Sequence, residues 1–165
     1  KASIGLPNSY RFERQEYPLD ASVTYNINRP SSINPPFISG VSIYTEDSLK
    51  KFVKDCNQDC IDGFDGIAND PQGVLDLYYK QKEMFAKNMD YPKDQVRVIN
   101  NRTWLFDDNE CIGDSCVIRT FSTFVGNVKI SVFMTDWRNE GETGAIRTPF
   151  PEPETTKAFE VLTIN

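Results

Sequence analysis

The segment Gln95–Asp136, QVRVINNRTWLFDDNECIGDSCVIRTFSTFVGNVKISVFMTD, is the part of the chain from which the fold can be predicted most directly. It contains four runs that are rich in β-branched and aromatic residues. Three turn-rich breaks separate these runs, at Asn100-Asn101, Asp107–Ser115 and Gly126-Asn127. Strands joined by such breaks pair as antiparallel neighbours. The segment therefore predicts a four-stranded antiparallel meander.

Two further strands are predicted upstream of the meander, preceded by an edge strand or an extended arm. Apolar and polar residues alternate in Ala21–Asn28, which is typical of a half-buried strand. Phe37–Tyr44 predicts another strand, with a bulge at Gly40. In residues 1–20, Tyr10 and Phe12 alternate with charged residues, which indicates an edge strand or an extended N-terminal arm.

Two central helices are predicted between these strands and the meander. Thr45 is placed to cap the first helix, whose buried stripe has the spacing of Leu49, Phe52, Val53 and Cys56. The second helix starts at Asp70-Pro71 and runs to about Asn88. Its apolar face is expected to hold Val74, Leu77, Tyr78, Gln81 and Phe85, and to be widened by Leu75 and Met84.

The last segment, Glu154–Ile164, has apolar residues at helical spacing and predicts a short C-terminal helix, with a final strand as the alternative because it contains β-branched residues. These elements predict an α+β fold. A largely antiparallel sheet, built on the meander, is covered by two central helices and the C-terminal helix. We expect residues 1–165 to form a single domain.

Composition argues against several classes of function. The chain of 165 residues has a net charge of −6 and no basic cluster, which disfavours nucleic-acid binding. It contains no histidine, so a Ser-His-Asp or Cys-His site and a His-ligated zinc site are impossible. No apolar run is long enough to span a membrane. We expect no cofactor, no resident metal and no catalytic activity.

The acidic run Asn57–Asp70 invites comparison with a calcium-binding loop. An EF-hand loop needs oxygen ligands at positions 1, 3 and 5 and a bidentate Glu at position 12. Counting from Asn57 puts Ile61 at the fifth position and Ala68 at the twelfth, so the pattern fails. A solvated turn explains the run without a metal.

The four cysteines occur as two close pairs, Cys56/Cys60 and Cys111/Cys116. Four cysteines allow three disulfide connectivities. The favoured one joins each cysteine to its close neighbour. Metal ligation or free thiols are the rival interpretation, but the spacings differ from two zinc knuckles. An uninterrupted helix would hold the Cβ atoms of Cys56 and Cys60 too far apart, so a bridge between them requires the helix to end there.

Disulfides imply an oxidising compartment, and we therefore expect a periplasmic or secreted protein. The chain begins with Lys1 and has no apolar leader, as expected once a signal peptide has been removed. A segment excised from a longer chain would look the same.

Two stretches are candidates for contact with a partner. Asp107, Asp108, Glu110, Ile112 and Asp114 crowd onto the break that the second cysteine pair flanks. Closure by a disulfide would stiffen this acidic tip and lower the entropy cost of binding. Trp137 and Arg138 belong to a second candidate loop, Thr135–Pro149, and both residue types are enriched at interface hot spots.

The order of the turn NNRTW, the hairpin CVIRTFSTFVGNVKISVFMTD and the segment ETTKAFEVL resembles the PsbP-like (DcrB-like) α/β sandwich group, over roughly residues 40–165. That resemblance implies a sheet closed by a terminal helix. Proteins that resemble this group include small bacterial envelope proteins, among them immunity proteins that neutralise secreted toxins. By analogy, this chain would occlude a toxin's active site. An accessory subunit of an envelope or photosynthetic complex is the alternative, and a carboxylate-dependent hydrolase is a third possibility.

Overall fold

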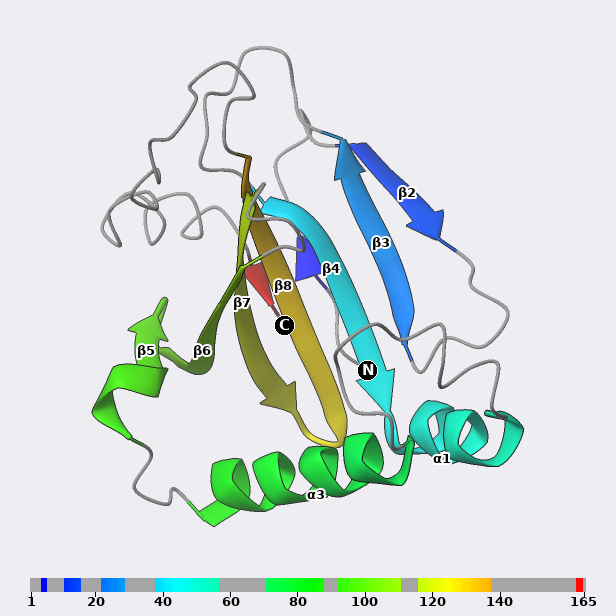
Figure 1. Cartoon of the computed structure of the whole chain (residues 1–165). Helices are drawn as coiled ribbons and strands as arrows, with labels where there is room; N and C mark the ends of the chain where they lie inside the picture. The colour runs from blue at the N-terminus through cyan, green and yellow to red at the C-terminus, as the bar shows by residue number, and fades with distance from the viewer. Residues whose placement is uncertain are drawn as a thin grey trace.

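The structure, a computed structural model, describes residues 4–5, 11–15, 22–28, 38–56, 71–87, 92–110, 116–137 and 163–164. Its main feature is a seven-stranded antiparallel sheet with the order β2-β3-β4-β8-β7-β6-β5 (Figure 1). In chain order the strands are β2 (Arg11–Gln15), β3 (Val23–Asn28), β4 (Ile38–Thr45), β5 (Val96–Ile99), β6 (Arg102–Glu110), β7 (Cys116–Val125) and β8 (Val128–Trp137).

Two helices and a second, very small sheet complete the described part of the chain. The helices are α1 (Glu46–Asp55) and α3 (Pro71–Lys87), and a short 3-10 helix, η1 (Lys93–Gln95), precedes β5. The small sheet pairs β1 (Ile4–Gly5) with β9 (Thr163–Ile164), and we call it the strap. The predicted α+β class is confirmed.

The meander forms as predicted, because β5, β6, β7 and β8 are consecutive antiparallel neighbours. Asn100 and Asn101 join β5 to β6 with φ angles of 52° and 58°. Two consecutive left-handed residues are what a tight hairpin turn requires, and Asn tolerates that conformation. Gly126, with φ of 59°, begins the turn between β7 and β8.

The N-terminal strands also match the prediction. β2 lies at the edge of the sheet and pairs with β3, which pairs in turn with β4. The pairing of β4 with β8 shifts register between Ile38 and Gly40, where the bulge was predicted. Because β4 pairs with β8, the last strand of the meander, the chain must cross the sheet between β4 and β5, and α1 and α3 lie in this crossover.

The large sheet buries apolar side chains on both faces. On the helix face, Tyr44 of β4 and Phe124 of β7 pack against Leu49 and Phe52 of α1 and against Leu75 and Tyr78 of α3. On the strap face, Ile4 and Ile164 of the strap pack against the larger cluster, which consists of Ile27, Ile38, Val41, Ile99, Trp104, Phe121, Ile130, Val132 and Met134. The sheet is therefore the middle layer of the fold.

Helix α1 begins with a reciprocal cap and ends at the cysteine. The Ser48 amide donates to Thr45 Oγ1 over 3.1 Å, and the Thr45 amide donates to Ser48 Oγ over 3.0 Å. The helix ends at Asp55, and Cys56 has extended backbone angles, with φ −73° and ψ 118°. Cys56 is disulfide-bonded. A bridge to Cys60 requires such an ending, but the side chain of Cys60 lies outside the described residues.

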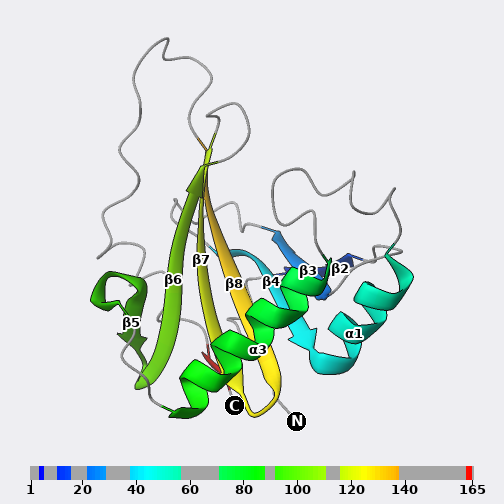
Figure 2. The same cartoon turned by 60° about the horizontal axis from the view of Figure 1, so that its bottom comes forward.

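Helix α3 spans nearly the predicted range, but one expected core residue was wrong. Leu75 and Tyr78 are buried, whereas Leu77 is 50% exposed. The rotation of the helix is fixed by Tyr78, whose hydroxyl donates to the Asn127 carbonyl at the β7–β8 turn. Leu77 is one residue, or about 100° of helical rotation, away from that contact. In both views α3 runs beside this turn (Figures 1 and 2).

At its last two described residues the segment predicted as a C-terminal helix is a strand, which was the alternative prediction. Thr163 and Ile164 form β9 and pair with Gly5 and Ile4 of β1. Both are β-branched, and the strap gives them a hydrogen-bonded neighbour that a helix-spacing argument cannot anticipate. The rest of the predicted helix, residues 154–162, lies outside the described residues.

Candidate functional site

Those predicted partner-binding residues that the structure describes belong to the end of the large sheet that lies away from α3 (Figure 2). Asp107, Asp108 and Glu110 are in β6, and Trp137 is the last residue of β8. The side chain of Asp107 is exposed. Ile112, Asp114 and Arg138 lie outside the described residues. We call residues 107–110, 116–117 and 136–137 the distal end.

The acidic residues stand on a strand rather than on a loop, which corrects the predicted break at Asp107. β6 continues to Glu110 because Asp107, Asp108 and Glu110 pair with Thr120, Arg119 and Val117 of β7. Ladder pairing with a strand rich in β-branched residues outweighs the low β-propensity of Asp. Similarly, Thr135–Trp137, predicted as the start of a loop, belongs to β8.

The sheet brings the two predicted contact stretches together. Cys116 pairs with Trp137 across β7 and β8, while Val117 pairs with Glu110 across β7 and β6. The acidic end of β6 and the Trp137 end of β8 therefore flank the first residues of β7. The two stretches were predicted as separate surfaces, but their backbones lie together at one end of the large sheet.

The sequence contains enough information to predict that these two stretches are adjacent. The turn at Gly126-Asn127 has two residues, so Val125 faces Val128 and every later pair is fixed by counting outward. Counting nine further pairs reaches Cys116 and Trp137. The prediction missed the adjacency because it did not extend the register of the hairpin to its open end.

Lys129 is the described residue with the most perturbed titration. It pairs with Tyr44 on one side and Phe124 on the other, and its ammonium lies 5.5 Å from the centroid of the Tyr44 ring. Burial lowers the pKa of Lys129 to about 8, while the Asp107 carboxylate opposes the shift. An amine with such a pKa can act as a base near neutral pH.

A row of buried hydroxyls lies next to Lys129. Ser42, Ser131 and Ser122 are consecutive register partners on β4, β8 and β7, and all three are buried. Ser122 Oγ and Ser131 Oγ are 2.8 Å apart, and Thr24 Oγ1 lies 2.7 Å from Ser42 Oγ. The hydroxyls therefore satisfy one another inside the fold.

A lysine base beside serines is an arrangement that can support nucleophilic catalysis. Burial of the serine side chains argues against nucleophilic catalysis at this place. Ser122 and Ser131 are buried and hydrogen-bonded to each other, so neither hydroxyl is exposed as a nucleophile. We therefore assign these groups to the packing of the sheet.

Two cavities lie at the strap. The larger, about 580 Å³, is bordered by Thr163 and Ile164 of β9 and by the start of β6. The smaller, about 500 Å³, is lined almost entirely by apolar side chains, namely Ile4, Tyr25, Val41, Ile43, Thr45, Val128 and Ile130. Neither cavity was predicted from the sequence, because both depend on the pairing of β1 with β9.

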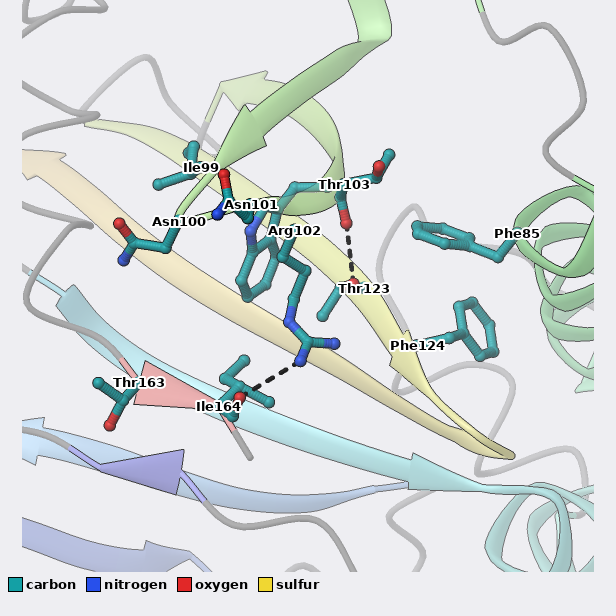
Figure 3. A pocket seen from close by; sticks show the side chains of 11 residues that line it. Phe85, Ile99, Asn100, Asn101, Arg102, Thr103, Thr123, Phe124, Thr163 and Ile164 are labelled. Carbon is teal, nitrogen blue, oxygen red and sulfur yellow. Dashed lines mark hydrogen bonds between the residues drawn. The ribbon is translucent and has the colours of Figure 1, made fainter.

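The larger cavity is a slot between two strands that separate. The β6–β7 ladder stops at Leu105–Ser122, and no pair forms between Arg102–Trp104 and Thr123–Val125, although the structure describes both segments. The Thr123 hydroxyl bridges the gap by donating to the Thr103 carbonyl over 2.8 Å. Figure 3 shows Arg102 extending across this space toward Ile164. We call this cavity the β6–β7 slot.

Other features of the described residues limit what the site can be. No group of three His, Cys, Asp or Glu side chains in the described segments is arranged to hold a metal ion. Neither helix that the structure describes has both the length and the apolar character needed to cross a membrane. No family model, curated protein or solved structure matches this chain.

Proposed function

We propose that this chain is an extracytoplasmic binding protein that inhibits another protein by covering its functional site. Its most concrete form is an immunity protein that neutralises a secreted toxin enzyme. The observation that supports it best is the register of β6, β7 and β8, which gathers the acidic end of β6 and Trp137 at the distal end. The binding surface is this end, continued by Ile112, Asp114 and Arg138.

The chemistry of the distal end suits a basic partner. Asp107, Asp108, Glu110 and Asp114 supply carboxylates, which complement a cleft lined by Lys or Arg. Trp137 and Arg138 are the residue types that most often anchor interfaces. Three paired strands support the backbone of this surface, so little conformational entropy is lost on binding.

The compartment follows from the cysteines. The disulfide at Cys56 supports an oxidising location, either periplasmic or secreted. We propose local bridges, Cys56–Cys60 and Cys111–Cys116, of which the second would stiffen the tip next to the distal end. The resemblance to the PsbP-like group is part of the same proposal, and the chain itself carries out no catalysis in it.

The test is a binding assay with the product of a toxin gene adjacent to the gene for this chain. Asp114→Lys and Trp137→Ala should each weaken binding by about tenfold to a hundredfold, the effect expected of hot-spot residues. The matched control is Asp94→Lys, a charge reversal at an exposed carboxylate outside the distal end. Full-strength binding by both Asp114→Lys and Trp137→Ala would exclude this surface.

A second candidate function is an accessory subunit that assembles into a larger envelope or photosynthetic complex. Val98, on the edge strand β5, is 71% exposed. An exposed apolar residue on an edge strand is a feature that can support pairing with another chain. Val98→Asp should then abolish co-sedimentation with the complex while Trp137→Ala leaves it intact, and the opposite result favours the inhibitor.

A further inference from the structure

We propose that the β6–β7 slot is a binding site for a small organic acid, specifically a carboxylate attached to a flat apolar ring. The site is separate from the distal end, and the inference does not depend on the inhibitor proposal. Its volume of about 580 Å³ lies within the range of pockets that hold small molecules. The splayed strands create this space where a continuous ladder would have closed it.

The charge of the residues that line the slot favours an anionic ligand. Among the eleven described residues that line the slot, Arg102 is the one charged side chain, and none is acidic. The whole protein carries a net charge of −6, so a cationic pocket stands out against its surroundings. A positive group in a partly enclosed space attracts an anion more strongly than it would on an open surface.

The guanidinium of Arg102 is well placed for a carboxylate. Arg102 Nη2 donates to the Ile164 carbonyl over 3.3 Å, a long hydrogen bond to a neutral acceptor. A carboxylate would accept two parallel bonds from the planar guanidinium, and such charge-assisted pairs are shorter and stronger. The side chain is thus held across the slot by a contact that a carboxylate can displace or share.

The walls favour a ring. Trp104 is buried at the slot, and Ile99 lies beside it. Phe124 and Phe85 line the side nearer α3, and their ring centroids are 5.2 Å apart (Figure 3). Aromatic walls stack or make edge contacts with a flat ligand. Six of the eleven lining residues are polar or charged, so the slot combines these aromatic walls with a polar rim that consists of Asn100, Asn101, Arg102, Thr103, Thr123 and Thr163.

The rim is fixed before any ligand arrives. Asn101 lies in the tight β5–β6 turn with φ of 58°, immediately before Arg102. The Thr123–Thr103 bond ties β7 to β6 across the slot. A rim built from a hairpin turn and a bridged strand needs little rearrangement, which reduces the entropy cost of binding.

The experiment is a titration of the full ¹⁵N-labelled chain, followed by amide and indole NMR shifts. The probes are benzoate and 2-naphthoate, each compared with its neutral amide, benzamide and 2-naphthamide. We expect saturable shifts at Asn101, Arg102 and Trp104, with each acid binding at least about tenfold more tightly than its amide. The naphthoate should bind more tightly than the benzoate because it covers more of the aromatic walls.

Two variants and one control test the role of the guanidinium. Arg102→Gln should weaken binding of the acids by at least about tenfold, and Arg102→Lys should give an intermediate value because it keeps charge without the planar fork. Arg119→Gln, which neutralises an arginine of β7 outside the slot, should bind like the unmodified chain.

Absence of shifts at these residues up to about 10 mM probe would overturn the proposal. Equal affinity for acid and amide, or undiminished binding by Arg102→Gln, would also overturn it. If Arg102→Gln fails to fold, as its own spectrum would reveal, the comparison of acids with amides on the unmodified chain still decides the question.

Discussion

The hydroxyl of Tyr78 in α3 donates a hydrogen bond of 2.5 Å to the backbone carbonyl of Asn127, 49 residues away in the β7–β8 turn. Tyr78 is also buried, with its ring 5.6 Å from that of Phe124. This single side chain thus orients the helix and caps one end of the central hairpin.

Replacing Tyr78 by Phe should lower the free energy of unfolding by about 1 kcal/mol, since the ring remains while a hydrogen bond is lost. Denaturant unfolding would measure the change. The matched control is Tyr79→Phe, whose exposed hydroxyl donates to Glu46 Oε1 over 3.0 Å. We expect that control to change stability by less than about 0.5 kcal/mol. Equal effects from the two variants would contradict the orienting role of Tyr78.

The cap of α1 should contribute measurably to stability. Thr45→Ala removes the acceptor of the Ser48 amide and should cost about 1 kcal/mol, the usual effect of losing an N-cap side chain. Ser48→Ala removes the reciprocal bond to the Thr45 amide and should cost less. Circular dichroism during urea unfolding would measure both. A neutral Thr45→Ala would mean that the sheet alone holds the start of α1.

Lys129 should make stability depend on pH in the alkaline range. Its pKa falls from 10.5 to about 8 on folding, chiefly through burial. The folded state binds this proton less tightly than the unfolded state does, so the charged lysine lowers the free energy of unfolding. This loss of stability is fully present below pH 8 and disappears as the pH rises from 8 to 10.5. At about 1.4 kcal/mol per pH unit, the penalty is bounded near 3 kcal/mol, and the Tyr44 ring offsets part of it.

Lys129→Met should therefore stabilise the protein by about 1–3 kcal/mol at pH 7, and the gain should shrink toward pH 10. Urea unfolding at several pH values measures this difference. Lys51→Met, at an exposed position of α1, is the control and should show no comparable gain. A gain for Lys129→Met that is independent of pH would indicate better packing rather than removal of a buried charge.

The hydroxyl row should behave as coupled pairs. Ser131→Ala removes one partner of the 2.8 Å contact with Ser122 and should cost about 1–2 kcal/mol. The double variant Ser122→Ala/Ser131→Ala should cost less than the sum of the single variants, because neither hydroxyl is then left behind. A thermal or urea double-mutant cycle measures the coupling. Strict additivity would show that the two hydroxyls do not depend on each other.

The parts of the fold that depend on local chemistry could be predicted from the sequence. Asn100-Asn101 and Gly126-Asn127 mark turns because few other residues accept the backbone angles of tight hairpins. Gly40 lies at the register shift of β4, and Thr45 marks the start of α1 through its capping side chain.

The parts that depend on distant contacts could not be predicted in this way. The exposure of Leu77 follows from the bond between Tyr78 and Asn127, which no periodicity encodes. The strand at Thr163–Ile164 was only the alternative prediction, because its partner, Ile4–Gly5, lies at the other end of the sequence. The distal end is intermediate, since its residues were predicted but their adjacency required the full register of the β7–β8 hairpin.

The strap also determines how the molecule should respond to mechanical tension. Ile4 pairs with Ile164 and Gly5 with Thr163, so a pull applied outward at residues 4 and 164 acts on the same end of an antiparallel pair. Such a pull opens hydrogen bonds one after another, whereas shear would break them together. A two-residue ladder offers little resistance to this opening. Weak outward tension at residues 4 and 164 should therefore separate the two strands of the strap while the seven-stranded sheet stays folded.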